Sequence, residues 1–293
     1  MRFSYVLVTP ARNEEKYVEG VIRSVACQSI LPLRWIIVSD GSTDRTDEIV
    51  RSQTENLDFV GFIRLGEHRE RNFAAKVEAF AAGQKLLAGI DYDIIGNLDA
   101  DVSFGPDYFE YLLKRFAENP RLGVAGTPFV ENGGRYDYRF TNIEHVSGQC
   151  QLFRRQCFDE IGGYRPIKGG GIDWVAVTSA RMLGWQTRTF TGKTFCHHRA
   201  MGTGNRSGLR LHFTQGRKDY SCGNHPLWEL FRAAYQSGAK PYIFRGLLIL
   251  SGYVWSSVRR EKRAIPPDLT RFIRAEQLRR LRAKVFRGHR VNR

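Results

Sequence analysis

The 293-residue sequence lacks several features that would mark other classes of protein. Its five cysteines include no C-x-x-C pair, so a structural zinc site and a disulfide framework have no support and a reducing compartment fits best. The uncharged stretch that begins at Gly246 covers only 13 positions, too few for a membrane-spanning helix. The N-terminus lacks the small-residue cleavage site of a signal peptide, and residues 3–11 are interpreted as a strand.

Acidic residues are scarce toward the C-terminus. The formal net charge is +15, and residues 254–293 hold 13 Lys and Arg against 3 Asp and Glu. A tail of this kind can face an anionic membrane, a nucleic acid or water. The tail by itself therefore identifies no partner.

Short apolar runs alternate with helical patterns in the first half of the chain, which is typical of βα units and a mostly parallel sheet. Asn13 is expected to cap the first helix, and Asp173 is expected to precede a helix that begins at Trp174. The expected strands cover residues 5–8, 35–38, 59–65, 93–98, 122–127 and 149–153.

Acidic residues gather where the expected strands end. Glu14 and Glu15 follow the first strand, Asp40 ends the second, and Asp99 and Asp101 end the fourth. Ligands of open α/β sheets bind outside the carboxyl ends of the strands. A divalent cation would offset the repulsion among these carboxylates, and ligands that are all oxygen suit Mg²⁺ or Mn²⁺. A metal site is therefore expected here, with a simple capped turn as the alternative for the Asp-x-Asp pattern.

Four motifs, taken in order, resemble the family 2 glycosyltransferases of the GT-A fold: residues 8–15, 39–44, 98–101 and 162–164. This resemblance covers about residues 4–200 and implies an α/β, Rossmann-like, mostly parallel mixed sheet flanked by helices. It also implies a hexosyltransferase-type enzyme that moves a single sugar from a nucleotide diphosphate sugar to an acceptor hydroxyl with inversion. The residues expected to bind the donor are Thr9, Pro10, Ala11, Asn13, Glu15, Asp40, Lys76, Asp99, Ala100 and Arg206.

The same resemblance implies a metal ligand and a catalytic base. Asp101 would hold Mn²⁺ or Mg²⁺, and His197 or His198 could add an imidazole, with ordinary hydrogen-bonded histidines as the alternative. Family members usually have an acidic pair after Gly-Gly-Tyr, and here Asp173 alone matches it. A carboxylate facing the leaving group would accept the proton of the acceptor hydroxyl. The alternative role of Asp173 is that of a helix cap.

Two parts of the chain are expected. Residues 1–225 would form the GT-A catalytic domain, with a nucleotide-sugar-binding half at 1–128 and an acceptor-binding half at 129–225, and residues 226–293 a helical, basic extension. The segment from His225 to Glu229 and the basic tail weakly resemble bacterial polysaccharide-assembly members, which points to a lipid-linked glycan acceptor. We therefore expect a peripheral position on the inner face of the cytoplasmic membrane, with residues 242–258 as a buried or interfacial helix.

Two other functions compete with this interpretation. A sugar nucleotidyltransferase would share the sheet and the metal, but it needs a glycine-rich phosphate loop and residues 9–15 contain no glycine. A nucleic-acid-binding protein could use the basic tail, but it would leave the strand-end aspartates unexplained, so no nucleic-acid partner is expected. An NAD-dependent oxidoreductase is disfavoured because no G-x-G-x-x-G follows the first strand.

Overall fold

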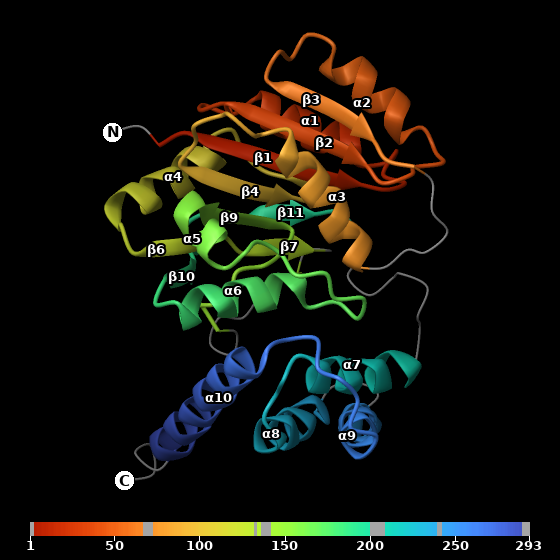
Figure 1. Ribbon diagram of the computed structural model, residues 1–293, viewed down its shortest axis with the longest axis vertical. Helices are drawn as coiled ribbons and strands as arrows, with labels where there is room; N and C mark the ends of the chain where they lie inside the picture. Colours follow the sequence, from red (N-terminus) through yellow and green to blue (C-terminus); the bar gives the residue numbers. More distant parts are fainter. Residues whose placement is uncertain are drawn as a thin grey trace. The chain divides into compact units, whose positions relative to one another are not determined.

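The chain forms two compact units, Met1–Ala200 and Met201–Arg293. The first is an α/β unit and the second is helical (Figure 1). The computed structural model describes residues 3–66, 73–131, 134–135, 142–199, 209–238 and 242–288. The sequence placed the boundary at residue 225, but α7 (Leu209–Ser221) packs closely on α9 (Tyr242–Val258), so the boundary lies near residue 200 instead.

The first unit is built on a seven-stranded sheet with the order β10-β6-β9-β4-β1-β2-β3. Its neighbouring strands pair in parallel, except that β9 runs antiparallel to both β4 and β6. The predicted mostly parallel mixed sheet is therefore confirmed. The strands are β1 (Tyr5–Ala11), β2 (Arg34–Ser39), β3 (Val60–Arg64), β4 (Ile94–Leu98), β6 (Leu122–Gly126), β9 (Cys150–Arg154) and β10 (Gln186–Thr189).

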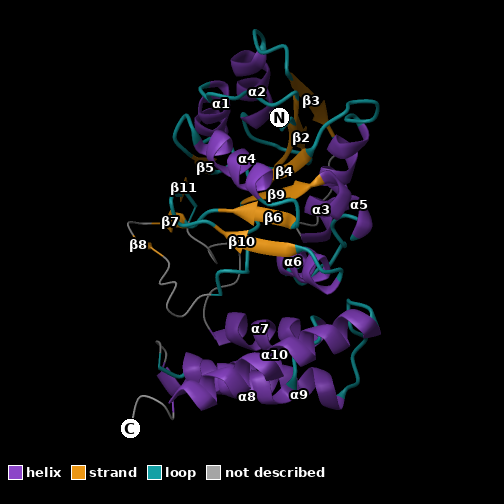
Figure 2. Ribbon diagram, turned by 90° about the vertical axis from the view of Figure 1, so that its left-hand side faces the viewer, coloured by secondary structure: helices purple, strands orange, loops and turns teal. Residues whose placement is uncertain are grey.

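Helices cover both faces of this sheet (Figures 1 and 2). Side chains alternate between the faces along a strand, so Tyr5 and Leu7 of β1 join one buried apolar cluster while Val6 and Val8 join the other. The first cluster includes residues of α1 (Val18–Ala26), α2 (Thr46–Thr54) and α4 (Tyr108–Glu118). The second includes residues of α3 (Phe73–Lys85), α5 (Arg155–Glu160) and α6 (Ile172–Met182).

A second, smaller sheet has the order β5-β11-β7-β8. In it, β11 pairs antiparallel with β5, which directly follows the Asp-x-Asp motif, and parallel with β7. This pairing brings residues near position 197 beside residues near position 102, far away along the chain. Its strands are β5 (Val102–Ser103), β7 (Phe129–Glu131), β8 (Gly134–Arg135) and β11 (Phe195–His197).

The second unit consists of α7, α8 (Pro226–Gln236), α9 and α10 (Pro267–Gly288). Helices α7 and α9 approach closely at glycines. A Cβ atom on Gly216 would lie 1.8 Å from the carbonyl oxygen of Ile249, and one on Gly252 would lie 2.0 Å from that of Phe213. Either contact is far inside van der Waals distance, so only glycine permits this packing. Across the described ranges, no helix combines the length and the apolar character needed to cross a bilayer.

Candidate active site

The carboxyl ends of β1, β2 and β4 meet at one edge of the large sheet, as the strand-end rule predicts. The backbone N–H of Asp40 donates to the carbonyl of Ala11 at 2.8 Å, which joins the ends of β2 and β1. The Arg12 guanidinium lies 3.8 Å from the Asp40 carboxylate. The predicted residues Ala11 and Asp40 therefore share this edge.

The loop after β1 is fastened to the loop after β2. Asn13 adopts the left-handed conformation with φ 56°, and its Oδ1 atom accepts the backbone N–H of Thr43 at 2.8 Å. Glu15 accepts the N–H of Arg45 at 3.2 Å. The prediction that Asn13 caps the first helix is wrong, because α1 begins only at Val18 and the Asn13 side chain bonds the neighbouring loop instead.

Three predicted donor-binding residues support the core. Thr9 is fully buried, and its hydroxyl accepts the indole N–H of Trp35 at 2.9 Å. Ala11 and Ala100 belong to the buried apolar cluster, whereas Pro10 is partly exposed. The side chain of Thr9 therefore holds two strands together and does not line the edge, because its hydroxyl already has a buried partner.

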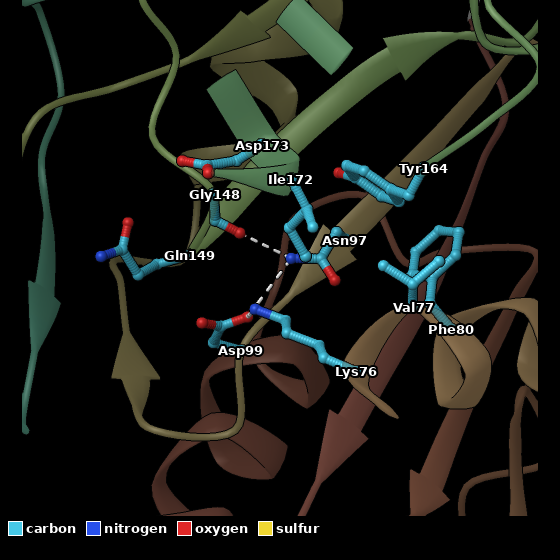
Figure 3. Close-up of a pocket in the computed structure, with 10 residues that line it drawn as sticks. All are labelled: Lys76, Val77, Phe80, Asn97, Asp99, Gly148, Gln149, Tyr164, Ile172 and Asp173. Atoms are coloured by element: carbon cyan, nitrogen blue, oxygen red, sulfur yellow. Dashed lines mark hydrogen bonds and ion pairs between the residues drawn. The ribbon is translucent and has the colours of Figure 1, made fainter. Parts of the chain in front are cut away.

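A cavity of about 130 Å³ opens beside the end of β4 (Figure 3). The Lys76 ammonium from α3 lies 2.5 Å from Oδ1 of Asp99, and the side-chain amide of Asn97 donates to the same oxygen at 3.2 Å. The structure thus brings the predicted Lys76, Asp99 and Asp173 to one pocket. Its lining residues are Lys76, Val77, Phe80, Asn97, Asp99, Gly148, Gln149, Tyr164, Ile172 and Asp173.

Lys76 is the cation of this pocket. Burial favours its neutral form, but the carboxylates of Asp99, Asp173 and Asp101 outweigh burial and raise the pKa of Lys76. Burial raises the pKa of Asp99, and the donors Lys76 and Asn97 act against that rise. The pocket therefore holds an ammonium group at neutral pH, and this group is paired with Asp99.

Asp173 lies in the first turn of α6, which begins at Ile172 rather than at the predicted Trp174. The N-cap position is held by Gly171 with φ 90°, and no side chain caps the helix. The carboxylate stands over Gly148, where a Cβ atom would lie 2.7 Å from Cβ of Asp173 (Figure 3). Among the residues that the structure describes, none donates a hydrogen bond to the side-chain carboxylate of Asp173. A role for Asp173 as a mere helix cap is therefore not supported.

Asp101 and His197 meet where β5 pairs with β11. The Nε2 atom of His197 lies 3.5 Å from Oδ2 of Asp101, and its Nδ1 atom lies 2.8 Å from the carboxylate of Glu131. Burial lowers the pKa of the imidazole, but its hydrogen bonds to Asp101 and Glu131 outweigh burial and raise it. His198 instead contacts Ser103 through Nε2 at 2.8 Å. Of the two predicted imidazoles, only that of His197 faces the Asp101 carboxylate, whereas the backbone N–H of His198 donates to the Asp101 carbonyl at 2.9 Å.

The donor set at Asp101 fits a divalent cation. Oδ1 of Asp101 is buried and has no hydrogen bond within the described part of the chain. Histidines that bind metals commonly direct their second nitrogen to a carboxylate, as His197 does toward Glu131. No group of three or more His, Cys, Asp and Glu side chains that could hold a metal occurs in the described segments. Asp101 and His197 would be two of the ligands, and phosphate or water oxygens could take further positions.

Arg199, which the sequence motifs did not predict, belongs to this edge. Its guanidinium bonds the carboxylate of Glu14, lies 3.6 Å from Oδ2 of Asp101 and stands 5.6 Å from the ring centroid of Tyr17. The one available signal was its position directly after the two histidines. The predicted Arg206 lies outside the described residues.

Comparison with known proteins identifies a family profile. Residues 6–168 match Glycosyl transferase family 2. Poly-beta-1,6-N-acetyl-D-glucosamine synthase of Staphylococcus aureus (strain COL) is 32% identical over 136 residues, which are 46% of this chain and 31% of the relative. The enzyme of the same name from Staphylococcus epidermidis is 31% identical over 153 residues, covering 46% of this chain and 35% of the relative. The chain thus spans about a third of the length of these curated relatives.

Two solved structures share the fold. Mannosyltransferase PcManGT from Pyrobaculum calidifontis, in complex with GDP-Man and Mn²⁺, superposes with a TM-score of 0.57 at 18% identity, over 98% of this chain and 81% of that one. Residues 1–349 of Staphylococcus aureus TarS, in complex with UDP-GlcNAc, superpose with a TM-score of 0.57 at 15% identity. The match covers 86% of this chain and 71% of that one. At these identities the likeness concerns the fold alone.

Proposed function

Because the chain belongs to glycosyltransferase family 2, we propose that it transfers one sugar from a nucleotide diphosphate sugar to an acceptor hydroxyl with inversion at the anomeric carbon. The observation that carries this proposal is the pocket in which Lys76 and Asp99 share one cavity with Asp173. Asp101, which follows the pocket residue Asp99 by two positions, forms a second polar pair with His197. The arrangement combines cations, a candidate metal site and a carboxylate without donors, which are the groups that this reaction needs.

The donor would lie along the carboxyl edge of the sheet. Asp40 and the loop after β1 would hold the nucleoside, and Asp99 would face the ribose. Arg199 and Lys76, which pair with carboxylates in this structure, would donate charged hydrogen bonds to the diphosphate. UDP and GDP sugars are the first donors to test, since the structural neighbours were solved with UDP-GlcNAc and GDP-Man.

Asp101 and His197 would hold Mn²⁺ or Mg²⁺. When bound, such a cation supplies charge stabilisation to the departing diphosphate. Support comes from the buried Asp101 Oδ1 atom without a hydrogen bond and from the orientation of His197 by Glu131. His198 is left out of the proposal because its Nε2 atom contacts Ser103.

Asp173 would act as the catalytic base. The acceptor hydroxyl must lose its proton as its oxygen attacks the anomeric carbon, and a carboxylate in the same pocket can accept that proton. Asp173 suits this task because no described residue donates a hydrogen bond to it, so its oxygens remain available. Tyr164 of the Gly-Gly-Tyr motif lines the same cavity and donates to Gln151 at 2.7 Å, which fixes the ring at the wall.

The acceptor would be a lipid-linked glycan in extracellular polysaccharide assembly. The matched relatives are named as synthases of a poly-N-acetylglucosamine, and this supports the class of reaction. The basic tail from residue 254 supports work at an anionic membrane surface, on the inner face of the cytoplasmic membrane.

A thermal-shift panel of UDP, GDP and dTDP sugars, with and without Mn²⁺, tests the proposal. A ligand that binds only the folded state at 100 times its Kd stabilises by about 2.7 kcal/mol, so the correct donor should raise the Tm, and should do so only with the metal. Asp101→Ala is the control that should lose this metal dependence. Stabilisation by a nucleoside triphosphate and a sugar phosphate, with release of pyrophosphate, would instead identify a nucleotidyltransferase.

A further inference from the structure

Helix α8 directs an apolar stripe outward. Its large exposed side chains recur at spacings of three and four residues, which places them on one side of the helix. The opposite side holds Glu229, which is fully buried. The exposed stripe consists of Leu227, Leu230, Phe231 and Tyr235.

Helix α9 repeats this arrangement. At 100° per residue the exposed large apolar side chains of α9 that follow Tyr242 fall on one side, and its buried residues fall on the other. Arg245 is the one charged residue in its sequence, and the buried side faces α7 through Gly252. Helices α8 and α9 pack against each other, so both stripes belong to one unit. The exposed side chains of α9 are Tyr242, Ile243, Phe244, Leu247, Val254, Trp255 and Val258.

The interior of the same unit contains a polar network among its buried apolar side chains. The side chain of Asn224 donates to buried Glu229 at 3.2 Å and accepts from Gln277 at 2.8 Å, and the Tyr253 hydroxyl donates to the Asn224 carbonyl at 2.7 Å. Soluble proteins normally bury apolar residues and expose polar ones, and they rarely expose large contiguous apolar patches. The exposed apolar side chains of α8 and α9 depart from this pattern, which suits them to an apolar surrounding.

The charges next to α9 indicate what kind of surface its exposed apolar side chains contact. Arg259, Arg260 and Lys262 are exposed directly after its last turn, and the Arg259 guanidinium lies 4.3 Å from the ring centroid of Trp255. The neighbouring acid, Glu261, is already paired with Arg217. A second copy of the chain would bring like charges together here, whereas anionic headgroups complement them. Aromatic and basic residues at the border of an apolar stripe are typical of a membrane interface.

We propose that α8 and α9 together form a docking face that lies in the interface of an anionic phospholipid bilayer. The exposed apolar side chains of α8 and α9 enter the acyl boundary, and Arg259, Arg260 and Lys262 remain at the headgroups. The inference rests on the proposed function in one respect: a position at the membrane surface would bring the lipid-linked acceptor within reach of the enzyme. It differs from attachment by the basic tail alone, because the apolar faces of two helices supply part of the affinity.

Flotation of the full chain with vesicles tests the docking face. We expect binding to phosphatidylcholine vesicles that contain phosphatidylglycerol, and weaker binding to phosphatidylcholine alone or at high salt. Leu230→Glu and Leu247→Glu should each lower the partition coefficient by about tenfold or more, since each removes a buried leucine from the lipid. Leu86→Glu is the matched control, because Leu86 is 50% exposed in the first unit, and it should bind like the native chain.

Equal vesicle binding by the native chain and Leu247→Glu would overturn the proposal. The proposal would also be overturned if the native chain does not bind vesicles but forms a dimer that Leu247→Glu dissociates, because the face would then pack against a second copy. If circular dichroism shows that a glutamate variant does not fold, quenching of the native chain's tryptophan fluorescence by brominated lipid tests the docking face instead. Trp255→Phe must then lose most of this quenching. The metal-dependent thermal shift with donor is measured without vesicles, so failure of docking and failure of the proposed function remain distinguishable.

Discussion

The imidazole of His197 lies between two carboxylates, with Nε2 3.5 Å from Asp101 and Nδ1 2.8 Å from Glu131. The contact to Glu131 orients the ring, and it leaves Nε2 directed at the carboxylate of the Asp-x-Asp motif. The imidazole of the adjacent His198 instead contacts the Ser103 hydroxyl. Two histidines next to each other in the sequence therefore have different surroundings, and this difference is measurable.

Replacement of each histidine separates their roles. His197→Ala should raise the Mn²⁺ concentration for half-maximal turnover about 10- to 100-fold, because the cation loses a ligand, and EDTA should abolish turnover of the native enzyme. His198→Ala should leave the metal requirement near the native value. Metal titrations of initial rate check both, and equal effects of the two substitutions would remove His197 from the metal site.

Asp173→Asn should lower kcat by about 100-fold or more while donor affinity stays unchanged, because the amide keeps the shape of the side chain but cannot accept the proton. Single-turnover rates and a donor binding isotherm measure the two quantities. Asp91→Asn is the control, since Asp91 is an exposed carboxylate that pairs with Arg155 at 3.3 Å. A parallel loss of donor affinity in Asp173→Asn would assign Asp173 to donor binding instead.

The stability of the helical unit should fall as pH rises. Burial raises the pKa of Glu229 to about 8, and nearby Asp219 adds to the rise. The folded chain therefore holds a proton that the unfolded chain releases above pH 4.5, so stability decreases between pH 4.5 and 8 and is constant above. The gain in stability of Glu229→Gln over the native chain should be largest above pH 8 and smallest near pH 4.5. Urea unfolding at several pH values checks this, and parallel pH profiles would contradict it.

Gly216→Ala should destabilise the contact between α7 and α9 by at least about 2 kcal/mol, because the added Cβ atom cannot fit beside the Ile249 carbonyl. Amide hydrogen exchange in α7 and α9 should accelerate accordingly. Gly20→Ala in α1 is the control: a Cβ atom there meets nothing within 4 Å, so the gain in helix propensity should stabilise by about 0.5–1 kcal/mol. Unchanged exchange in Gly216→Ala would show that the helices can separate without cost.

Features that depend on local spacing were predictable. Buried strands leave continuous apolar runs, and the strand-end rule then located Asp40, Asp99 and Asp101 at one edge. Features that depend on distant contacts were not. Asn13 is a residue type that often caps helices, but its side chain instead accepts the backbone N–H of Thr43 in the next loop. The boundary at residue 225 was wrong because the contact of Gly216 with α9 has no local pattern.

The candidate metal pair shows the same limit. The sequence singled out Asp101 and both histidines, but it offered no means to choose between the histidines. That choice depends on the pairing of β11 with β5 and on Glu131 at the end of β7, both of which join distant segments. Arg199 was missed for a similar reason, since its partner Glu14 follows the first strand.

The reversed strand β9 has a consequence for how the protein is made. It lies between β4 and β6, both of which precede it in the chain, so a ribosome that has released residues 94–126 has produced two strands without their shared neighbour. The N–H of Asp99 can reach the Gln149 carbonyl, at 2.8 Å in the folded chain, only after a much later stretch has emerged. Since domains generally fold as units during synthesis, the edge that carries Asp99 is completed only after β9 has emerged. Truncated nascent chains that stop before β9 would expose unpaired strand edges to chaperones.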